Sequence, residues 1–263
     1  MRLPAARMGP DLDLPEDLAV GPWTRSLHVA IEHHDLDAVQ WALAKGADPA
    51  RLWPMTLTDL DDGNIQVVGG YNALHHAVMQ TFPEQAAEDV ETPPQIHLGI
   101  LQALLETHMD PNTLSYPWPE ANTALEGLIW SIPENLQDAT RLLLEYGAKP
   151  RATTLALLAG SNHPDSVALI SVLLQAVPEQ ERIALLTDIN LKDLTNQELS
   201  PVQLVCLREL VKAGISLDRP FRGSQRGSKT PAEAILKHNP NGDQMLHFLN
   251  PERISSRAKH GRP

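Results

Sequence analysis

Arg25-Ser-Leu-His-Val-Ala-Ile-Glu-His-His-Asp-Leu-Asp-Ala-Val-Gln-Trp-Ala-Leu-Ala-Lys-Gly-Ala-Asp-Pro49 is the stretch that decides the fold of this 263-residue chain. Its beginning returns as Asn72-Ala-Leu-His-His-Ala-Val78, and its end returns as Leu144-Glu-Tyr-Gly-Ala-Lys-Pro150. A unit that recurs in this way predicts a helix, a tight turn, a second helix and a hairpin connector, with successive units stacked in series. Stacked units generally provide binding surfaces rather than catalytic clefts.

Local signals inside the first unit agree with this interpretation. Leu27, Ala30 and Ile31 lie at positions i, i+3 and i+4, which is the apolar face of a helix. Gly46 stands where the second helix must end in a left-handed residue. The unit is therefore expected to end at Gly46, before Asp48-Pro49 opens the hairpin.

These residues resemble the ankyrin repeat, whose signature reads Thr-Pro-Leu-His-x-Ala-Ala, a turn, and Leu-Leu-Leu-x-x-Gly-Ala-Asp. The stretch 25–50 matches that signature in length without a gap, although Arg25-Ser26 replaces Thr-Pro and His34-Asp35 replaces Gly-His. The resemblance implies that His28 and His75 are structural histidines, which in this family bond to backbone groups of the turns.

The resemblance extends over residues 23–250 and implies an all-α ankyrin-repeat solenoid of about five to six helix–turn–helix units with hairpin connectors. Residues 1–22 form an acidic segment and residues 251–263 a basic tail, and both are expected to be disordered. The later helix pairs are expected at 72–78 with 100–112, 123–129 with 139–150, 154–159 with 167–174, 182–186 with 203–214, and 230–236 with 243–249.

Two connectors depart from the regular repeat. Asp61-Asp62-Gly63-Asn64 lies between apolar residues in alternation, which predicts that residues 51–70 form an enlarged hairpin finger. About 15 residues are inserted in the second unit, and the Pro-rich stretch Gln80–Gln95 is interpreted as a protruding loop. In ankyrin proteins the hairpins and inner helices line the groove that holds partners, so the finger lies where binding is expected.

The charge of −12 is unevenly distributed. Residues 1–218 carry 30 Asp and Glu against 12 Lys and Arg, whereas residues 219–263 carry 3 against 9. No Lys or Arg occurs between Arg51 and Arg141, an interval of 89 residues that holds thirteen carboxylates. Such an interval repels nucleic acid and anionic lipid and attracts basic partners. The alternative is that the acidity only keeps the protein in solution.

The sequence contains no clear motif for nucleotide binding, metal binding or nucleophilic catalysis. Gly223–Thr230 lacks the glycine–lysine spacing of a phosphate-binding loop. The eleven histidines include no spacing typical of a zinc site, and we expect neither metal nor cofactor. Cys206 lies in an apolar helical setting where a thiol is normally inert. A single cysteine and the lack of a long apolar run favour a cytoplasmic protein, with secretion by a route other than a signal peptide left open.

The sequence therefore predicts a non-catalytic protein–protein interaction module that binds a basic or amphipathic partner through an acidic concave face. Tyr and Trp are favoured at binding surfaces, and His76 is a further candidate, which could face the groove and titrate near neutral pH. The predicted partner-binding residues are Trp53, Asp59, Asp61, Asp62, Tyr71, His76, Trp118, Glu126 and Trp130. For the aromatic residues, the alternative is that they only cover the edge of the stack.

Three other functions stay open at this point. The chain could be a bacterial secreted effector or a regulatory protein that acts on a host or enzyme partner. It could be an enzyme subunit with its activity in the irregular segment 177–200, although no catalytic constellation is recognisable there. The four cations Arg253, Arg257, Lys259 and Arg262 could also let the tail contact nucleic acid.

Overall fold

The computed structural model describes residues 21–58, 65–79, 95–115, 122–220 and 230–251. The chain divides into two compact units, which meet in sequence between Lys149 and Pro150. Each unit is a stack of helix pairs and is described by itself.

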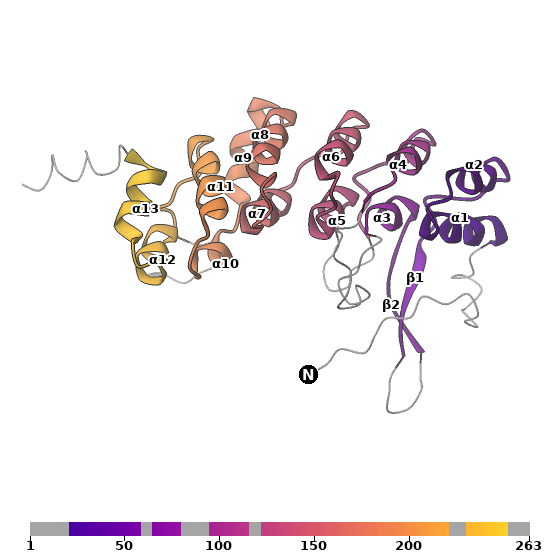
Figure 1. Ribbon diagram of the computed structural model, residues 1–263, viewed down its shortest axis with the longest axis horizontal. Helices are drawn as coiled ribbons and strands as arrows, with labels where there is room; N and C mark the ends of the chain where they lie inside the picture. Colours follow the sequence, from indigo (N-terminus) through magenta and orange to yellow (C-terminus); the bar gives the residue numbers. More distant parts are fainter. Residues whose placement is uncertain (1–20, 59–64, 80–94, 116–121, 221–229, 252–263) are drawn as a thin grey trace, which may run out of the picture. The chain divides into compact units, whose positions relative to one another are not determined.

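The N-terminal unit contains three helix pairs (Figure 1). The inner helices α1, α3 and α5 pack against one another in sequence, and the outer helices α2, α4 and α6 do the same. The bounds are Pro22–Glu32 for α1, Leu36–Ala44 for α2, Ala73–Val78 for α3, Leu98–Leu105 for α4, Ala124–Ser131 for α5 and Leu136–Glu145 for α6. Leucine and isoleucine side chains fill the space between the rows, with Leu27, Leu101, Leu104, Leu125 and Leu143 fully buried.

Side-chain caps and a glycine set where some of these helices begin and end. The Asp35 carboxylate accepts a hydrogen bond from the Ala38 N–H, and the Asn72 side chain accepts one from the His75 N–H. Both bonds satisfy backbone donors that the first turn of a helix leaves unpaired. Gly46 has φ of +89°, the left-handed conformation that the sequence predicted at the end of the first unit.

The predicted finger is confirmed as an antiparallel hairpin of β1 (Trp53–Thr58) and β2 (Ile65–Tyr71). Trp53 pairs with Tyr71 at its base, and Met55 pairs with Gly69. Thr56 pairs with Val67, so β2 contains one extra residue at this point, which is a β-bulge. The turn 59–64 and the predicted loop 80–94 lie outside the described residues.

The C-terminal unit also contains three helix pairs. The inner helices α7, α10 and α12 pack in sequence, as do the outer helices α8, α11 and α13. The bounds are Ala152–Gly160 for α7, Ser166–Ala176 for α8, Glu179–Asp188 for α9, Lys192–Thr195 for α10, Pro201–Lys212 for α11, Pro231–His238 for α12 and Gly242–Leu249 for α13. The described chain thus holds six pairs, at the upper end of the expected five to six.

The predicted composition of the fifth pair is wrong. Residues 182–186 belong to α9, which lies outside the pairs and packs on α7. The inner helix that accompanies α11 is the four-residue α10. Burial explains why α10 rather than α9 occupies the inner row. Leu191 and Leu194, at the start of α10 and within it, are buried, whereas Ile183 of α9 is 75% exposed.

The last pair, α12 and α13, forms where the sequence placed a terminal unit. Thr230 accepts a hydrogen bond from the Glu233 N–H and the Glu233 carboxylate accepts one from the Thr230 N–H, which is a capping box at the start of α12. In the part of the chain that the structure describes, every helix is too short or too polar to cross a lipid bilayer.

Candidate protein-interaction site

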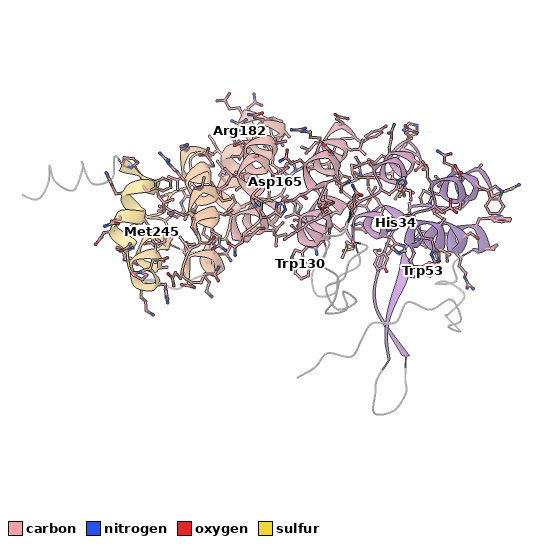
Figure 2. The ribbon with its side chains drawn as sticks, in the orientation of Figure 1. His34, Trp53, Trp130, Asp165, Arg182 and Met245 are labelled. Atoms are coloured by element: carbon pink, nitrogen blue, oxygen red, sulfur yellow. The ribbon has the colours of Figure 1, made fainter. Side chains whose placement is uncertain are left out.

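Four aromatic rings meet where the hairpin joins the inner helices of the N-terminal unit. Trp53 at the base of β1 (labelled in Figure 2) stacks on His28 of α1, with ring centroids 4.8 Å apart. His28 in turn stacks on His76 of α3 at 5.2 Å, and Tyr71 of β2 lies 5.4 Å from His76. All four side chains are buried. We call Trp53, His28, His76 and Tyr71 the hairpin-base cluster.

A hydrogen bond between two imidazoles lies at the centre of this cluster. Nδ1 of His28 and Nδ1 of His76 are 2.9 Å apart, so one neutral ring donates its Nδ1–H and the other accepts. Burial lowers the pKa of His28 to about 3, with the neighbouring His76 as a second cause, and burial lowers the pKa of His76 to about 4. The expectation that His76 faces the groove and titrates near neutral pH is therefore wrong.

His75 has the structural role that the family resemblance implies. Its Nε2–H donates to the backbone carbonyl of Asn122 over 2.9 Å, which ties α3 to the residue just before α5. Burial lowers its pKa, opposed by this hydrogen bond and by the charge of Glu126. His75 thus connects successive units.

Glu126 is a cap rather than a surface carboxylate. Its side chain is 1% exposed, and Oε2 accepts a hydrogen bond of 2.9 Å from the Thr123 N–H. Thr123 and Glu126 together form the capping box of α5. The residue replaces the signature histidine of the third unit, and its buried side chain offers no contact surface to a partner in this structure.

Among the predicted Trp and Tyr residues that the structure describes, Trp130 is the one left largely exposed, at 58%. It lies near the C-terminal end of α5, on the inner-helix side of the unit from which the hairpin also projects (Figure 2). The adjacent Ser131 hydroxyl donates to the Val78 carbonyl of α3 over 2.8 Å. A Cβ on Gly127 would lie 2.9 Å from Cγ of Met79, so α3 and α5 approach closely here. Trp130 therefore projects from a well-packed helix end.

The remaining predicted residues lie outside what the structure describes. These are Asp59, Asp61 and Asp62, which lie in sequence between β1 and β2, and Trp118 of the second connector. The structure brings Trp53, Tyr71 and His76 together, as a buried cluster rather than a surface.

An exposed aromatic pair was missed by the sequence analysis. Trp23 of α1 and Trp41 of α2 are 40% and 49% exposed, and their rings meet edge to face at 5.2 Å. The Lys45 ammonium lies 5.9 Å from the centre of the Trp41 ring. The signal was available, because Val39 and Ala42 occupy the buried face of α2 and leave position 41 on its outer side.

A cavity of about 340 Å³ in the C-terminal unit is lined in part by the segment 177–200, where an enzyme activity was the alternative expectation. Its walls are Ile183 of α9, the segment from Leu186 to Leu191, the segment from Ala213 to Ser216 after α11, and Arg219, Pro220 and Pro231. The polar groups of these walls include Asp188, Thr187 and Ser216, without a histidine or cysteine beside them. The wall residues thus include no Ser–His or Cys–His pair of the kind that many hydrolytic sites use.

The remaining candidates for chemistry in the described residues are the Cys206 thiol and possible metal ligands. Cys206 is buried, and burial raises the pKa of its thiol to about 11, where the reactive thiolate is scarce at neutral pH. Within the described ranges, no three His, Cys, Asp or Glu residues gather as metal ligands would.

Comparison with known families agrees with the geometry. Residues 27–88, which include the second half of α1 together with α2, β1, β2 and α3, match the family model described as ankyrin repeats (many copies). No curated protein matches the chain. The match confirms the predicted ankyrin repeats over residues 27–88, and the stacked helix pairs of both units are consistent with a solenoid of such repeats.

Proposed function

We propose that the protein is a non-catalytic interaction module whose N-terminal unit binds a basic or amphipathic protein partner on its inner-helix side. Ankyrin repeats are in general protein-interaction modules. The observation that carries the proposal is the exposed indole of Trp130, held at the packed end of α5 within the cation-free interval 52–140. Trp is favoured as an anchor because it offers a large contact area at a small cost in conformational entropy.

Charge supports a basic partner. The described part of the interval exposes the carboxylates of Glu106, Asp110, Glu134 and Asp138. Asp138 has Arg141 within 3.9 Å, but both side chains are exposed, and such pairs contribute little. Two of these residues, Glu134 and Asp138, follow Trp130 closely in the chain, in the turn and first turn of α6. An uncompensated acidic surface speeds association with a cationic partner and repels phosphate backbones.

The hairpin adds to this surface in the proposal. Asp59, Asp61 and Asp62 belong to its turn region, and we assign them to partner attraction together with Trp118 of the second connector. A regulatory or secreted-effector role, in the cytoplasm or in a host cell, would act through the same surface. The buried Trp53, Tyr71, His76 and Glu126 would then support the surface from beneath.

The test uses a defined cationic probe. We expect an 18-residue amphipathic helix of Lys and Leu to bind the full chain, and its Glu/Leu counterpart to bind at least about tenfold more weakly. Affinity for the Lys/Leu helix is expected to fall steeply from low to physiological salt, since exposed charges are screened. Fluorescence anisotropy of the labelled peptides measures both effects.

The Trp130→Ala variant tests whether the cationic peptide binds at the surface around Trp130. We expect it to weaken binding of the Lys/Leu helix about tenfold or more, as removal of an interface Trp commonly does. Trp41→Ala is the matched control, because Trp41 is similarly exposed but belongs to the outer helix α2. Equal losses in the two variants, or equal binding of both peptides, would show the proposal to be incorrect.

A further inference from the structure

The β1–β2 hairpin meets the inner helices through rings that include two titratable side chains. Trp53 and Tyr71 pair at the base of the hairpin, and each packs on one histidine, Trp53 on His28 and Tyr71 on His76. The two histidines come from successive inner helices, α1 and α3, and share one hydrogen bond of 2.9 Å. A change in either imidazole therefore acts on the hairpin and on the packing of two repeats together.

We propose that the His28–His76 pair is an acid-sensitive latch, which holds the hairpin against the inner helices and releases it when the pair takes up protons. The inference concerns the attachment of the hairpin and holds whether or not a partner binds there.

Protonation of the pair is unfavourable for three reasons. A first proton leaves the hydrogen bond possible, because an imidazolium Nδ1–H can still donate to the neutral ring, but it places a charge in a buried site. A second proton makes both Nδ1 atoms donors, so the bond is lost and two like charges face each other. In addition, His28 Nε2 is buried and has no hydrogen-bond partner among the described residues, so a proton there would lack an acceptor.

The surroundings offer little compensation for such charges. Besides the pair itself, the charged or titratable groups on the packed elements are the exposed Arg25 and Glu32 on α1, Asp37 on α2, Tyr71 on β2, His75 on α3, His97 at the start of α4 and Glu126 on α5. Glu32 and Asp37 are exposed, and Glu126 is engaged in the cap of α5. Nδ1 of His97 accepts from the Ile100 N–H. No salt bridge to either imidazole of the pair occurs in the described part of the chain.

The pH window follows from the lowered pKa values. With the hairpin attached the pKa values are about 3 for His28 and about 4 for His76, and a released, hydrated imidazole returns toward 6.5. Below pH 6.5 the released state therefore binds more protons than the attached state, and acid shifts the equilibrium toward release. The attachment is fully stable above pH 6.5 and weakens progressively down to about pH 4. Within this window, each proton taken up on release makes the equilibrium constant for release rise about tenfold for every unit by which the pH falls.

Amide hydrogen exchange on the full chain tests the latch. We expect the opening equilibrium of the Trp53, Tyr71 and Ala73 amides, corrected for intrinsic exchange, to rise at least about tenfold from pH 6.5 to pH 5.5. Amides in the last turn of α6, residues 142–145, should change far less over the same range. Equal changes at both places, or no change at the hairpin base, would overturn the proposal.

Variants assign the effect to the pair. The double variant His28→Phe with His76→Phe keeps two rings and removes both hydrogen-bonding partners together, which is often tolerated, and its hairpin exchange should lose the pH dependence. His33→Gln, at an exposed position beside the end of α1, is the matched control and should behave as wild type. His76→Gln leaves one titrating ring, so the logarithm of its hairpin opening equilibrium should change with pH about half as steeply as in wild type. This variant tests the latch if the double variant fails to fold. A full wild-type slope in His76→Gln would contradict the latch.

Discussion

At the residue scale, the structure shows how a single atom's surroundings decide a residue's role. A histidine occupies the same signature position in the first two units, yet His28 bonds to another imidazole and His75 to a backbone carbonyl. The third unit has Glu126 there, and the carboxylate turns back to cap its own helix. His28 and His75 were predicted as structural because the family pattern fixes this position. The burial of His76 was not predictable, since the hairpin residue Tyr71 that packs on it belongs to an enlarged connector.

Two glycines of the C-terminal unit give a prediction at this scale. A Cβ on Gly242 would lie 2.8 Å from Cα of Leu236 and 3.0 Å from the Ile235 carbonyl oxygen, and backbone atoms cannot move aside cheaply. Gly242→Ala is therefore expected to lower the free energy of unfolding by about 1–3 kcal/mol. Urea denaturation followed by circular dichroism measures the change.

Gly160→Ala is the control for that substitution. Gly160 lies at the end of α7, and apart from its chain neighbours and its own helix backbone no atom comes within 4 Å of its Cβ position. Alanine there should be neutral or stabilising by up to about 1 kcal/mol, because glycine is a poor helix former. A destabilisation by Gly160→Ala equal to that of Gly242→Ala would show that close packing is not the cause.

At the element scale, side-chain caps mark the start of two inner helices, α5 and α12, and the repeat pattern predicted helices there from residues 123 and 230. Thr123 and Thr230 stand three residues before Glu126 and Glu233, which is the pattern of a capping box. The four-residue α10 has no side-chain cap and too few residues for a periodic pattern, so the sequence pointed to α9 instead. A helix this short is specified by burial of Leu191 and Leu194 among its neighbours, which no local pattern reveals.

The capping box of α5 can be tested directly. Thr123→Ala removes the acceptor of the Glu126 N–H and should lower the free energy of unfolding by about 1 kcal/mol, within the range of about 0.5–2 kcal/mol measured for caps. Asn241→Ala is the comparison, because Asn241 precedes α13 without a capping hydrogen bond from its side chain. It should change stability by less than about 0.5 kcal/mol. Thermal unfolding of the two variants beside wild type separates these expectations.

At the scale of the whole molecule, the repeat pattern predicted the architecture, whereas the position of α9 and the interior of the hairpin base required the structure. The opening stretch 25–49 specified helix faces, a left-handed glycine and a connector, and each is present. Trp130 was predicted as one of several aromatic candidates, and only its exposure distinguishes it from Trp53 and Tyr71. Exposure depends on contacts between distant segments, and sequence spacing does not encode them.

The buried histidines make a prediction for the stability of the whole protein. Because the pKa values of His28 and His76 are lowered to about 3 and about 4, the unfolded chain binds more protons below pH 6.5, and stability falls as pH falls toward 4. Each histidine contributes a loss on the order of 1.5–2 kcal/mol between pH 6.5 and 5. The urea midpoint of wild type should therefore fall more over this range than that of the double variant of His28 and His76 to phenylalanine. Parallel pH profiles for the two proteins would contradict this expectation.

The stacking of Trp53 on His28 also has an optical consequence. An indole buried against an imidazole emits at a shorter wavelength than one in water, and a neighbouring imidazolium quenches it. The ring of Trp53 is thus a built-in fluorophore for the hairpin base. In a chain whose other tryptophans are replaced by phenylalanine, its emission colour and lifetime would report in real time whether the two strands lie on the helices.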